Sequence, residues 1–157
     1  MTELIRVENL KKHFPIRKGI LRKVKAHVKA VDGVSFSIHE KETIGLVGES
    51  GCGKTTAGRS ILKLLEPTEG SIEYREEEIT HLNKGQMRPL RRKLQIIFQD
   101  PYASLNPRMT VGKIIREGLD IHKIGMKRER DTMVAEVLER VGLPRNILDR
   151  YPHEFSG

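Results

Sequence analysis

The alternation of hydrophobic and polar positions predicts β-strands in the N-terminal part of this 157-residue chain. Residues 3–10 alternate weakly, and residues 28–38 alternate more regularly. Residues 43–47 and 94–98 are short, continuous apolar runs, which are typical of strands covered on both faces of a parallel sheet. Residues 71–74 predict a further strand, because they follow a Pro-Thr-Glu-Gly turn and resume an apolar alternation.

Helical spacing follows in other segments. Residues 56–65 carry apolar positions at helical intervals, residues 84–93 form a basic segment that we expect to be partly helical, and a helical pattern resumes at Val111. Within residues 127–141, one face carries five apolar side chains, Met133, Val134, Val137, Leu138 and Val141. We interpret that stripe as core packing, ended by Gly142-Leu143-Pro144.

Turn residues separate these elements. The basic residues 16–25, which include Gly19, predict a loop or a hairpin excursion. Asp32-Gly33 predicts a turn inside the alternating segment. Residues 75–78 read Arg-Glu-Glu-Glu, and because glutamate tolerates positive φ less well than glycine, we expect a looser turn or one of another type there.

One motif carries recognisable chemistry. The run Gly48-Glu49-Ser50-Gly51-Cys52-Gly53-Lys54-Thr55 fills every fixed position of the phosphate-binding pattern G-x-x-x-x-G-K-[ST]. Its glycines let consecutive N–H groups point at phosphate oxygens, Lys54 can reach the β- and γ-phosphates, and the Thr55 hydroxyl can bind Mg²⁺. An apolar run precedes the motif and a helical pattern follows it, so the phosphates would lie at a helix N-terminus.

Composition narrows the classes of function. The chain holds 29 Lys and Arg against 21 Asp and Glu, a net charge of +8, and nine of the basic residues lie within residues 1–30. Aromatic residues are not interleaved with this charge, so we expect a solvated face and no nucleic-acid partner, and proximity to a membrane surface stays open. No apolar stretch reaches the roughly 18 residues that span a bilayer, and no signal peptide is expected.

The cysteine and histidine residues indicate neither a disulfide nor a metal site. Cys52 is the single cysteine, which excludes an internal disulfide and suits a reducing cytosol. The six histidines are scattered and show no metal-ligand spacing.

Taken with the P-loop, three further motifs resemble the ATP-binding subunit of ABC transporters, and more narrowly its oligopeptide/dipeptide importer branch. Leu10-Lys11-Lys12-His13-Phe14 is similar to the A-loop, whose aromatic residue, here Phe14, stacks on adenine. Residues 98–111, which include Gln99, are similar to the Q-loop region of that branch. Residues 151–157 are similar to the lead-in to the ABC signature, which Ser156 and Gly157 would begin. The resemblance covers essentially the whole chain.

This resemblance implies an α/β fold: an ABC-type P-loop core with an incomplete parallel sheet, an N-terminal antiparallel β-subdomain and the start of an α-helical subdomain. It divides the chain into residues 1–98 and residues 99–157, with the remainder of the ABC domain absent. It also implies ATP and Mg²⁺ as cofactors. The implied nucleotide contacts are Phe14, Gly48, Glu49, Ser50, Gly51, Cys52, Gly53, Lys54, Thr55 and Thr56. Thr55 and Gln99 would lie at the metal, and Gln99 also beside the attacking water.

The resemblance further implies membrane-spanning permease subunits and a second ATP-binding subunit as partners, at the cytoplasmic face of the cell membrane. The implied activity is ATP hydrolysis that drives peptide import. The family's Walker B aspartate, catalytic glutamate and switch histidine cannot be assigned to residues of this chain, so we expect the chain alone to bind ATP without turnover.

Several alternatives remain open at this point. They are a regulatory or structural nucleotide-binding module without turnover, an importer for nickel or another small solute, and a nucleic-acid-linked ABC protein. A GTPase is disfavoured, because no Asn-Lys-x-Asp run occurs. The sequence decides neither the transported substrate nor whether the pair of subunits is a homodimer or a heterodimer.

Overall fold

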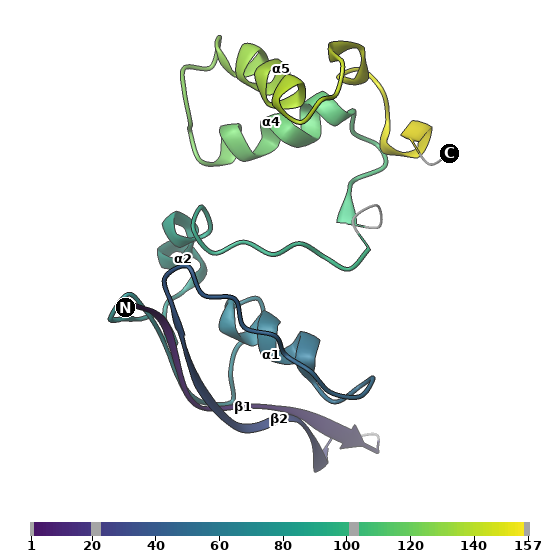
Figure 1. Ribbon diagram of the computed structural model, residues 1–157. Helices are drawn as coiled ribbons and strands as arrows, with labels where there is room; N and C mark the ends of the chain where they lie inside the picture. The colour runs from purple at the N-terminus through teal and green to yellow at the C-terminus, as the bar shows by residue number, and fades with distance from the viewer. Residues whose placement is uncertain (1, 20–22, 101–103, 156–157) are drawn as a thin grey trace. The chain divides into compact units, whose positions relative to one another are not determined.

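The computed structural model describes residues 2–19, 23–100 and 104–155, and it divides into two compact units (Figure 1). Unit 1 is Met1–Gln95 and unit 2 is Ile96–Gly157. The boundary lies close to the expected division between residues 98 and 99.

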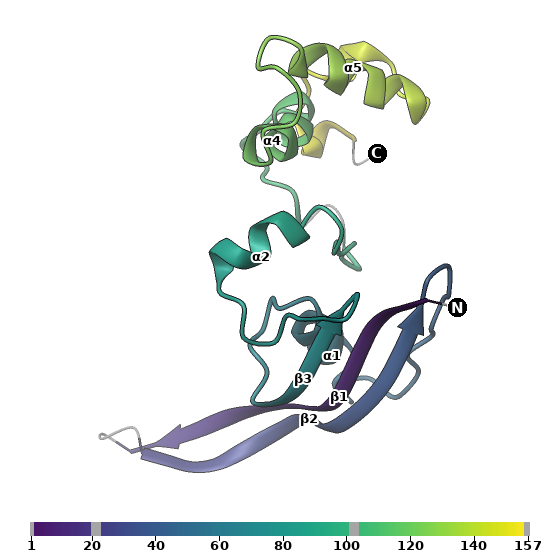
Figure 2. The same ribbon diagram turned by 90° about the vertical axis from the view of Figure 1, so that its left-hand side faces the viewer.

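Unit 1 is built on an antiparallel sheet with the strand order β2-β1-β3-β4 (Figure 2). The strands are β1 (Glu3–Lys18), β2 (Lys23–His39), β3 (Glu69–Tyr74) and β4 (Glu77–Glu78). β1 pairs with β2 along its whole length, from Glu3↔His39 to Lys18↔Lys23. The expected antiparallel β-subdomain and the basic hairpin excursion are therefore confirmed.

The core of unit 1 lies between this sheet and helix α1 (Lys54–Ile61). Leu10 and Ile72 are completely buried on the neighbouring strands β1 and β3. Ala57 is buried on the side of α1 that joins this core. Leu94 packs into the same cluster, because the chain returns to the core after helix α2 (Lys84–Leu90). These side chains supply the apolar burial that holds α1 beside the sheet.

The prediction of a turn at Asp32-Gly33 is wrong. β2 runs through both residues, and Gly33 is an extra residue between the pairs Leu10↔Val34 and Lys11↔Asp32. Its φ of 85° is the left-handed conformation of a glycine bulge. A bulge and a turn use the same residue types, and only the pairing with β1 distinguishes them.

The expectation of a loose turn at residues 75–78 is also wrong. Tyr74 pairs with Glu77, so the connection between β3 and β4 is a two-residue turn formed by Arg75 and Glu76. Both residues have positive φ, 52° and 67°, as a type I′ hairpin requires. Sheet pairing on both sides outweighs the cost of positive φ in two residues that are not glycine.

The two strands expected at 43–47 and 94–98 do not form. Both segments lack strand pairing, and Val47 and Ile97 are 94% and 93% exposed. An apolar run indicates burial, whereas a strand also needs a neighbour to complete its hydrogen-bond ladder. Among the residues that the structure describes, no strand pairs with either segment, so the expected parallel sheet is not formed in this chain.

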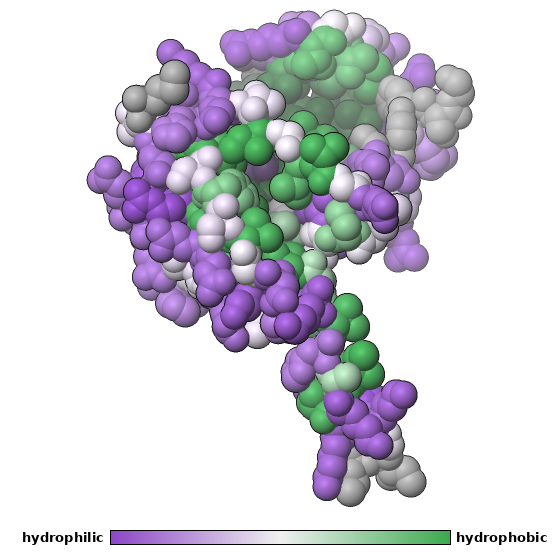
Figure 3. All heavy atoms as spheres, turned by 60° about the horizontal axis from the view of Figure 1, so that its bottom comes forward, coloured by the Kyte–Doolittle hydropathy of each residue, from purple (hydrophilic) through white to green (hydrophobic). Residues whose placement is uncertain are grey.

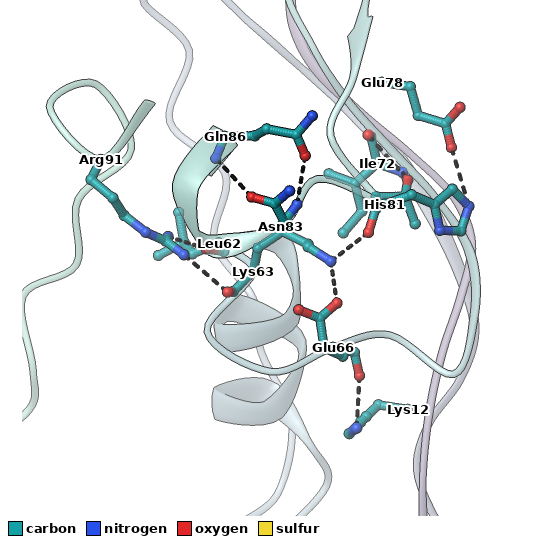
Figure 4. Close-up of polar contacts among 11 residues, drawn as sticks. Lys12, Leu62, Lys63, Glu66, Ile72, Glu78, His81, Asn83, Gln86 and Arg91 are labelled. Atoms are coloured by element: carbon teal, nitrogen blue, oxygen red, sulfur yellow. Dashed lines mark hydrogen bonds and ion pairs between the residues drawn. The ribbon is translucent and has the colours of Figure 1, made fainter. Parts of the chain in front are cut away.

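Helix α1 ends at Ile61, four residues before the expected end, because Lys63 adopts a positive φ of 53°. The Arg91 guanidinium donates to the carbonyl oxygens of Leu62 and Lys63, the second at 2.9 Å (Figure 4). These bonds satisfy carbonyl groups that a helix end leaves without partners.

Helix α2 begins with a capping box (Figure 4). The Asn83 side chain accepts from the Gln86 N–H at 3.0 Å, and the Gln86 side chain accepts from the Asn83 N–H at 2.9 Å. This confirms the partly helical character expected for residues 84–93.

Unit 2 is helical, with α4 (Val111–Ile121), α5 (Arg130–Arg140) and the short 3₁₀ turns η1 (Arg145–Ile147) and η2 (Pro152–Phe155). The apolar stripe on α5 divides: Val134 and Leu138 are buried, whereas Val137 and Val141 are exposed. Core packing is therefore confirmed for only part of the stripe, because helical spacing groups residues on a face without setting how much of it is covered. Gly142 ends the helix as expected, with φ of 77°.

Candidate nucleotide-binding site

The P-loop lies at the N-terminus of α1, as the motif requires. Gly53 is the N-cap with φ of 97°, and the helix begins at Lys54 with no acidic residue in its first turn. The N–H groups of the first turn have no intrahelical acceptors, and no side chain caps them. Together with the positive end of the helix dipole, they form a site suited to an anion such as phosphate.

The approach of the loop to the sheet explains the need for glycine at position 53. A Cβ placed on Gly53 would come within 2.0 Å of the carbonyl oxygen of Ala30 on β2. No side chain can be accommodated there, because the obstacle is backbone. Ala30 therefore helps to position the P-loop, although no sequence motif identifies it.

Lys54 folds over the loop that precedes it. Its Nζ donates to the carbonyl oxygens of Gly48 at 2.6 Å and Glu49 at 2.7 Å, and the Cys52 sulfur lies at 3.6 Å. These acceptors carry no formal charge, and no carboxylate pairs with this ammonium in the described parts of the chain. The positive charge at the centre of the loop is therefore not neutralised by the protein and is available to an anion.

Exposed hydroxyl groups and exposed residues of the loop complete the expected phosphate site. Thr55 is exposed at the second residue of α1, and Thr56 is half-buried beside it. Ser50 is exposed, and Cys52 is a free, exposed thiol. A hydroxyl, a lysine and a helix N-terminus fit the donor set that a magnesium-bound triphosphate needs.

Phe14 lies on the same β1–β2 ribbon that the P-loop contacts. It pairs with Val28, two residues before Ala30, and its ring is 38% exposed. The Lys12 ammonium lies 5.1 Å from the ring centroid, a cation–π distance. An exposed ring on this ribbon can stack against a flat base.

An ion-pair cluster steadies the ribbon at this point. Asp32 accepts from Lys29 at 3.0 Å and lies 2.9 Å from the His13 Nε2. Both contacts lower the pKa of the Asp32 carboxyl group, and the hydrogen bond from Lys29 is the larger cause. The cluster connects the residue before Phe14 to the glycine bulge on β2.

The remaining expected site residues belong to unit 2. Gln99 is exposed there, in a bend. Ser156 and Gly157 lie outside the described residues. No cluster of three or more metal-ligating side chains occurs in the described ranges, and no helix there is long and apolar enough to cross a membrane.

The loop at the N-terminus of α1, the lysine within it and its contact with a β-ribbon define a P-loop nucleotide-binding protein. The sequence model of the family described as "ABC transporter" matches residues 31–157. The chain belongs to that family.

Curated relatives agree with this family. The chain is 54% identical over 161 residues to the oligopeptide transport ATP-binding protein OppF of Bacillus subtilis, covering 100% of this chain and 50% of that protein. It is 49% identical over 155 residues to the oligopeptide transport ATP-binding protein AppF of the same organism, covering 98% of this chain and 47% of that protein. The chain thus spans about half the length of these relatives.

Solved structures support the fold. The ATP-binding cassette MJ0796, in a dimeric post-hydrolysis state bound to ADP and Pi, matches with a TM-score of 0.77 at 23% identity, over 98% of this chain and 63% of that one. A second dimeric structure of MJ0796 matches with a TM-score of 0.76 at 24% identity, over 98% and 64% of the two chains. The described elements are therefore part of an ABC cassette fold.

Proposed function

We propose that this chain is the ATP-binding, energy-coupling part of an ABC peptide importer. The observation that carries this proposal is the uncompensated Lys54 ammonium at the N-terminus of α1, inside a complete P-loop. Identity of about half to relatives named as oligopeptide transport ATP-binding proteins supports peptides as the cargo.

The residues that hold the nucleotide in this proposal come mainly from unit 1. The loop N–H groups, Lys54 and Thr55 bind the phosphates and Mg²⁺, and Phe14 stacks on adenine. Bound Mg²⁺ would neutralise phosphate charge, which is its role in phosphoryl transfer. Gln99 joins the metal shell or holds the attacking water, with the signature residues Ser156 and Gly157 acting on a second subunit's site.

The partners we propose are membrane-spanning permease subunits and a second ATP-binding subunit. The names of the curated relatives support the first, and the dimeric MJ0796 structures are consistent with the second. The proposed location is accordingly the cytoplasmic face of the membrane, where ATP is available and a permease can be contacted.

Binding of a fluorescent ATP analogue with Mg²⁺ tests the proposal. Lys54→Ala is expected to weaken binding by about 10- to 100-fold, because a hydrogen bond to a charged group contributes roughly 1.5–3 kcal/mol. Lys84→Ala, an exposed lysine at the start of α2, serves as the matched control and should bind as the unmodified chain does. Equal affinity of all three proteins would contradict the assignment of Lys54.

A second candidate is a nucleotide-binding module without turnover. The phosphate site at the N-terminus of α1 would serve such a module equally well. Release of phosphate from ATP by the purified chain, abolished in Lys54→Ala, would exclude this candidate. An importer for nickel or another small solute remains the alternative to a peptide importer.

A further inference from the structure

Among the described residues of unit 1, no third strand pairs with the outer part of the β1–β2 ribbon. The pairing of β1 with β3 ends at Lys11↔Glu69, whereas the pairing of β1 with β2 continues to Lys18↔Lys23. We call residues 13–18 and 23–29 the basic arm (Figure 2). From Phe14 onward, every described residue of the arm is exposed.

One face of the basic arm is apolar. Phe14 lies opposite Val28, and Ile16 lies opposite Ala26, and residues paired across an antiparallel ribbon share a face. Ile16 and Val28 on this face are 37% and 51% exposed. Figure 3 shows hydrophobic side chains open to solvent along the protruding arm, next to hydrophilic ones. A two-stranded ribbon with an uncovered aliphatic face is only marginally stable in water, so this face is suited to a partner.

The charge of the arm has a single sign. Its cations are Arg17, Lys18, Lys23, Lys25 and Lys29, and residues 13–18 and 23–29 contain no Asp or Glu. Lys29 pairs with Asp32 at 3.0 Å. The other four cations form no ion pair with any residue that the structure describes. The partner that complements this arm is therefore anionic over an extended area.

We propose that the basic arm docks on the surface of an anionic lipid bilayer. Aliphatic side chains enter the boundary between headgroups and acyl chains, while lysine and arginine remain at the headgroups, as in other amphipathic interfacial elements. A nucleic acid fits less well, because its bases stack on aromatic side chains and branched aliphatic side chains offer no flat ring for stacking. Phe14 is the one Phe, Tyr or Trp among the arm's described residues. A neutral protein surface fits less well too, because it would leave four cations of the arm without a counter-charge.

Vesicle sedimentation tests the proposal on the purified chain. Vesicles of phosphatidylcholine alone are compared with vesicles that contain about 30 mol % phosphatidylglycerol, each at about 0.05 M and about 0.5 M KCl. We expect the chain to pellet with the anionic vesicles at low salt and to be released at high salt. A parallel run without vesicles measures self-association.

Three pairs of substitutions separate binding by the arm from binding that depends only on the net positive charge of the chain. Lys23→Gln with Lys25→Gln is expected to lower the partition coefficient by about thirtyfold, because each lysine near an anionic surface changes it by about fivefold. Lys84→Gln with Lys93→Gln removes the same charge from exposed positions elsewhere in unit 1 and should change it little. Ile16→Ser with Val28→Ser should also lower the partition coefficient at low salt, because it removes apolar side chains from the face that enters the bilayer. Circular dichroism verifies that each variant keeps its secondary structure.

Specific outcomes would overturn the proposal. They are equal binding to neutral and anionic vesicles, no vesicle binding by the unmodified chain, or equal losses from the arm and control pairs. Tighter binding to a double-stranded DNA oligonucleotide than to anionic vesicles, lost in the arm pair alone, would assign the arm to nucleic acid instead. Binding of an ATP analogue should be unchanged in the variant with Lys23→Gln and Lys25→Gln, because neither lysine pairs with Phe14, so the loss of vesicle binding is independent of the nucleotide site.

Discussion

Two lysines of unit 1 show how neighbouring groups decide the role of a side chain. Lys63 is buried, and its ammonium donates to the Glu66 carboxylate and the Thr80 carbonyl oxygen (Figure 4). Its charge is compensated within unit 1 and is therefore not available to an anion. Lys54 is held only by uncharged acceptors of its own loop. Its charge is uncompensated, and this difference favours Lys54 as the anion-binding residue.

At Gly53 we expect a single added methyl group to disrupt the loop. Gly53→Ala should destabilise unit 1 by about 2–4 kcal/mol, the sum of left-handed backbone strain and overpacking against Ala30. Urea denaturation measures the change.

Gly58→Ala is the matched control for that substitution. Gly58 lies inside α1, and a Cβ there meets nothing within 4 Å. Alanine at this position should stabilise the helix by up to about 1 kcal/mol. If both substitutions changed the free energy of unfolding in the same direction, the close approach of Gly53 to β2 would not be the cause of the change at Gly53.

At the level of elements, the hairpins of unit 1 carry backbone strain that pairing overcomes. Arg75 and Glu76 both adopt positive φ in the turn between β3 and β4. Arg75 is additionally held by an ion pair to Glu40 at 2.9 Å. Glu76 forms the second turn position, where glycine is preferred.

Glu76→Gly is therefore expected to stabilise unit 1 by roughly 0.5–1 kcal/mol, since relief of left-handed strain exceeds the added freedom of the unfolded chain. Thermal unfolding followed by circular dichroism measures this change. Glu77→Gly, one position later in β4, should destabilise, because glycine weakens a strand. A loss of stability in both variants would show that the turn is not strained.

Acid should weaken the β1–β2 ribbon at the Asp32 cluster. Contacts with Lys29 and His13 lower the pKa of Asp32 below its unfolded value of about 3.9. A lowered folded-state pKa contributes stability that is present above the unfolded pKa and is lost as pH falls through the folded one.

Thermal melting points between about pH 7 and pH 2 measure this effect, and they should fall below about pH 4. In Asp32→Asn the acid-side decline should be shallower, since the titrating group is absent. Glu77→Gln, an exposed residue of β4 outside the cluster, should leave the decline as it is. If the melting temperature of Asp32→Asn fell with acid as steeply as that of the unmodified chain, the Asp32 cluster would not be the cause of the fall.

At the scale of the whole molecule, the chain consists of two units with different architectures. Unit 1 has its own core between sheet and helix, whereas α4 and α5 of unit 2 pack with fewer buried side chains. Apolar side chains such as Val47 and Ile97 are almost fully exposed. Exposed runs of this kind favour association of the chain with itself or with other apolar surfaces.

Nucleotide should stabilise the molecule through unit 1. With Mg²⁺-ATP at about one hundred times its dissociation constant, the free energy of unfolding should rise by about 2.7 kcal/mol, because the ligand binds the folded state. Differential scanning fluorimetry measures the shift in melting temperature. In Lys54→Ala at the same nucleotide concentration the stabilisation should fall to roughly 0.4–1.4 kcal/mol, as 10- to 100-fold weaker binding requires. An equal shift in that variant would point to binding outside the P-loop.

Much of unit 1 was predictable because its signals are local. The hairpin at residues 16–25, the strand at 71–74 and the position of the P-loop at a helix start depend on neighbouring residues in the chain. The P-loop, for example, needs a glycine and a helix N-terminus side by side, and the motif specifies both. The glycine bulge at Gly33 and the tight turn at Arg75-Glu76 were mispredicted, since each depends on register with another strand.

The sequence by itself determined which residues form the phosphate loop, where β1 folds back into β2 and that the arm is basic, because these properties are carried by adjacent residues. Only the tertiary structure decided that Gly53 lies against Ala30, that Lys54 has no carboxylate partner among the described residues, and that the apolar runs at 43–47 and 94–98 remain unpaired. The physical reason is that close approach, charge compensation and strand pairing each require a second segment, whose position a local pattern does not contain.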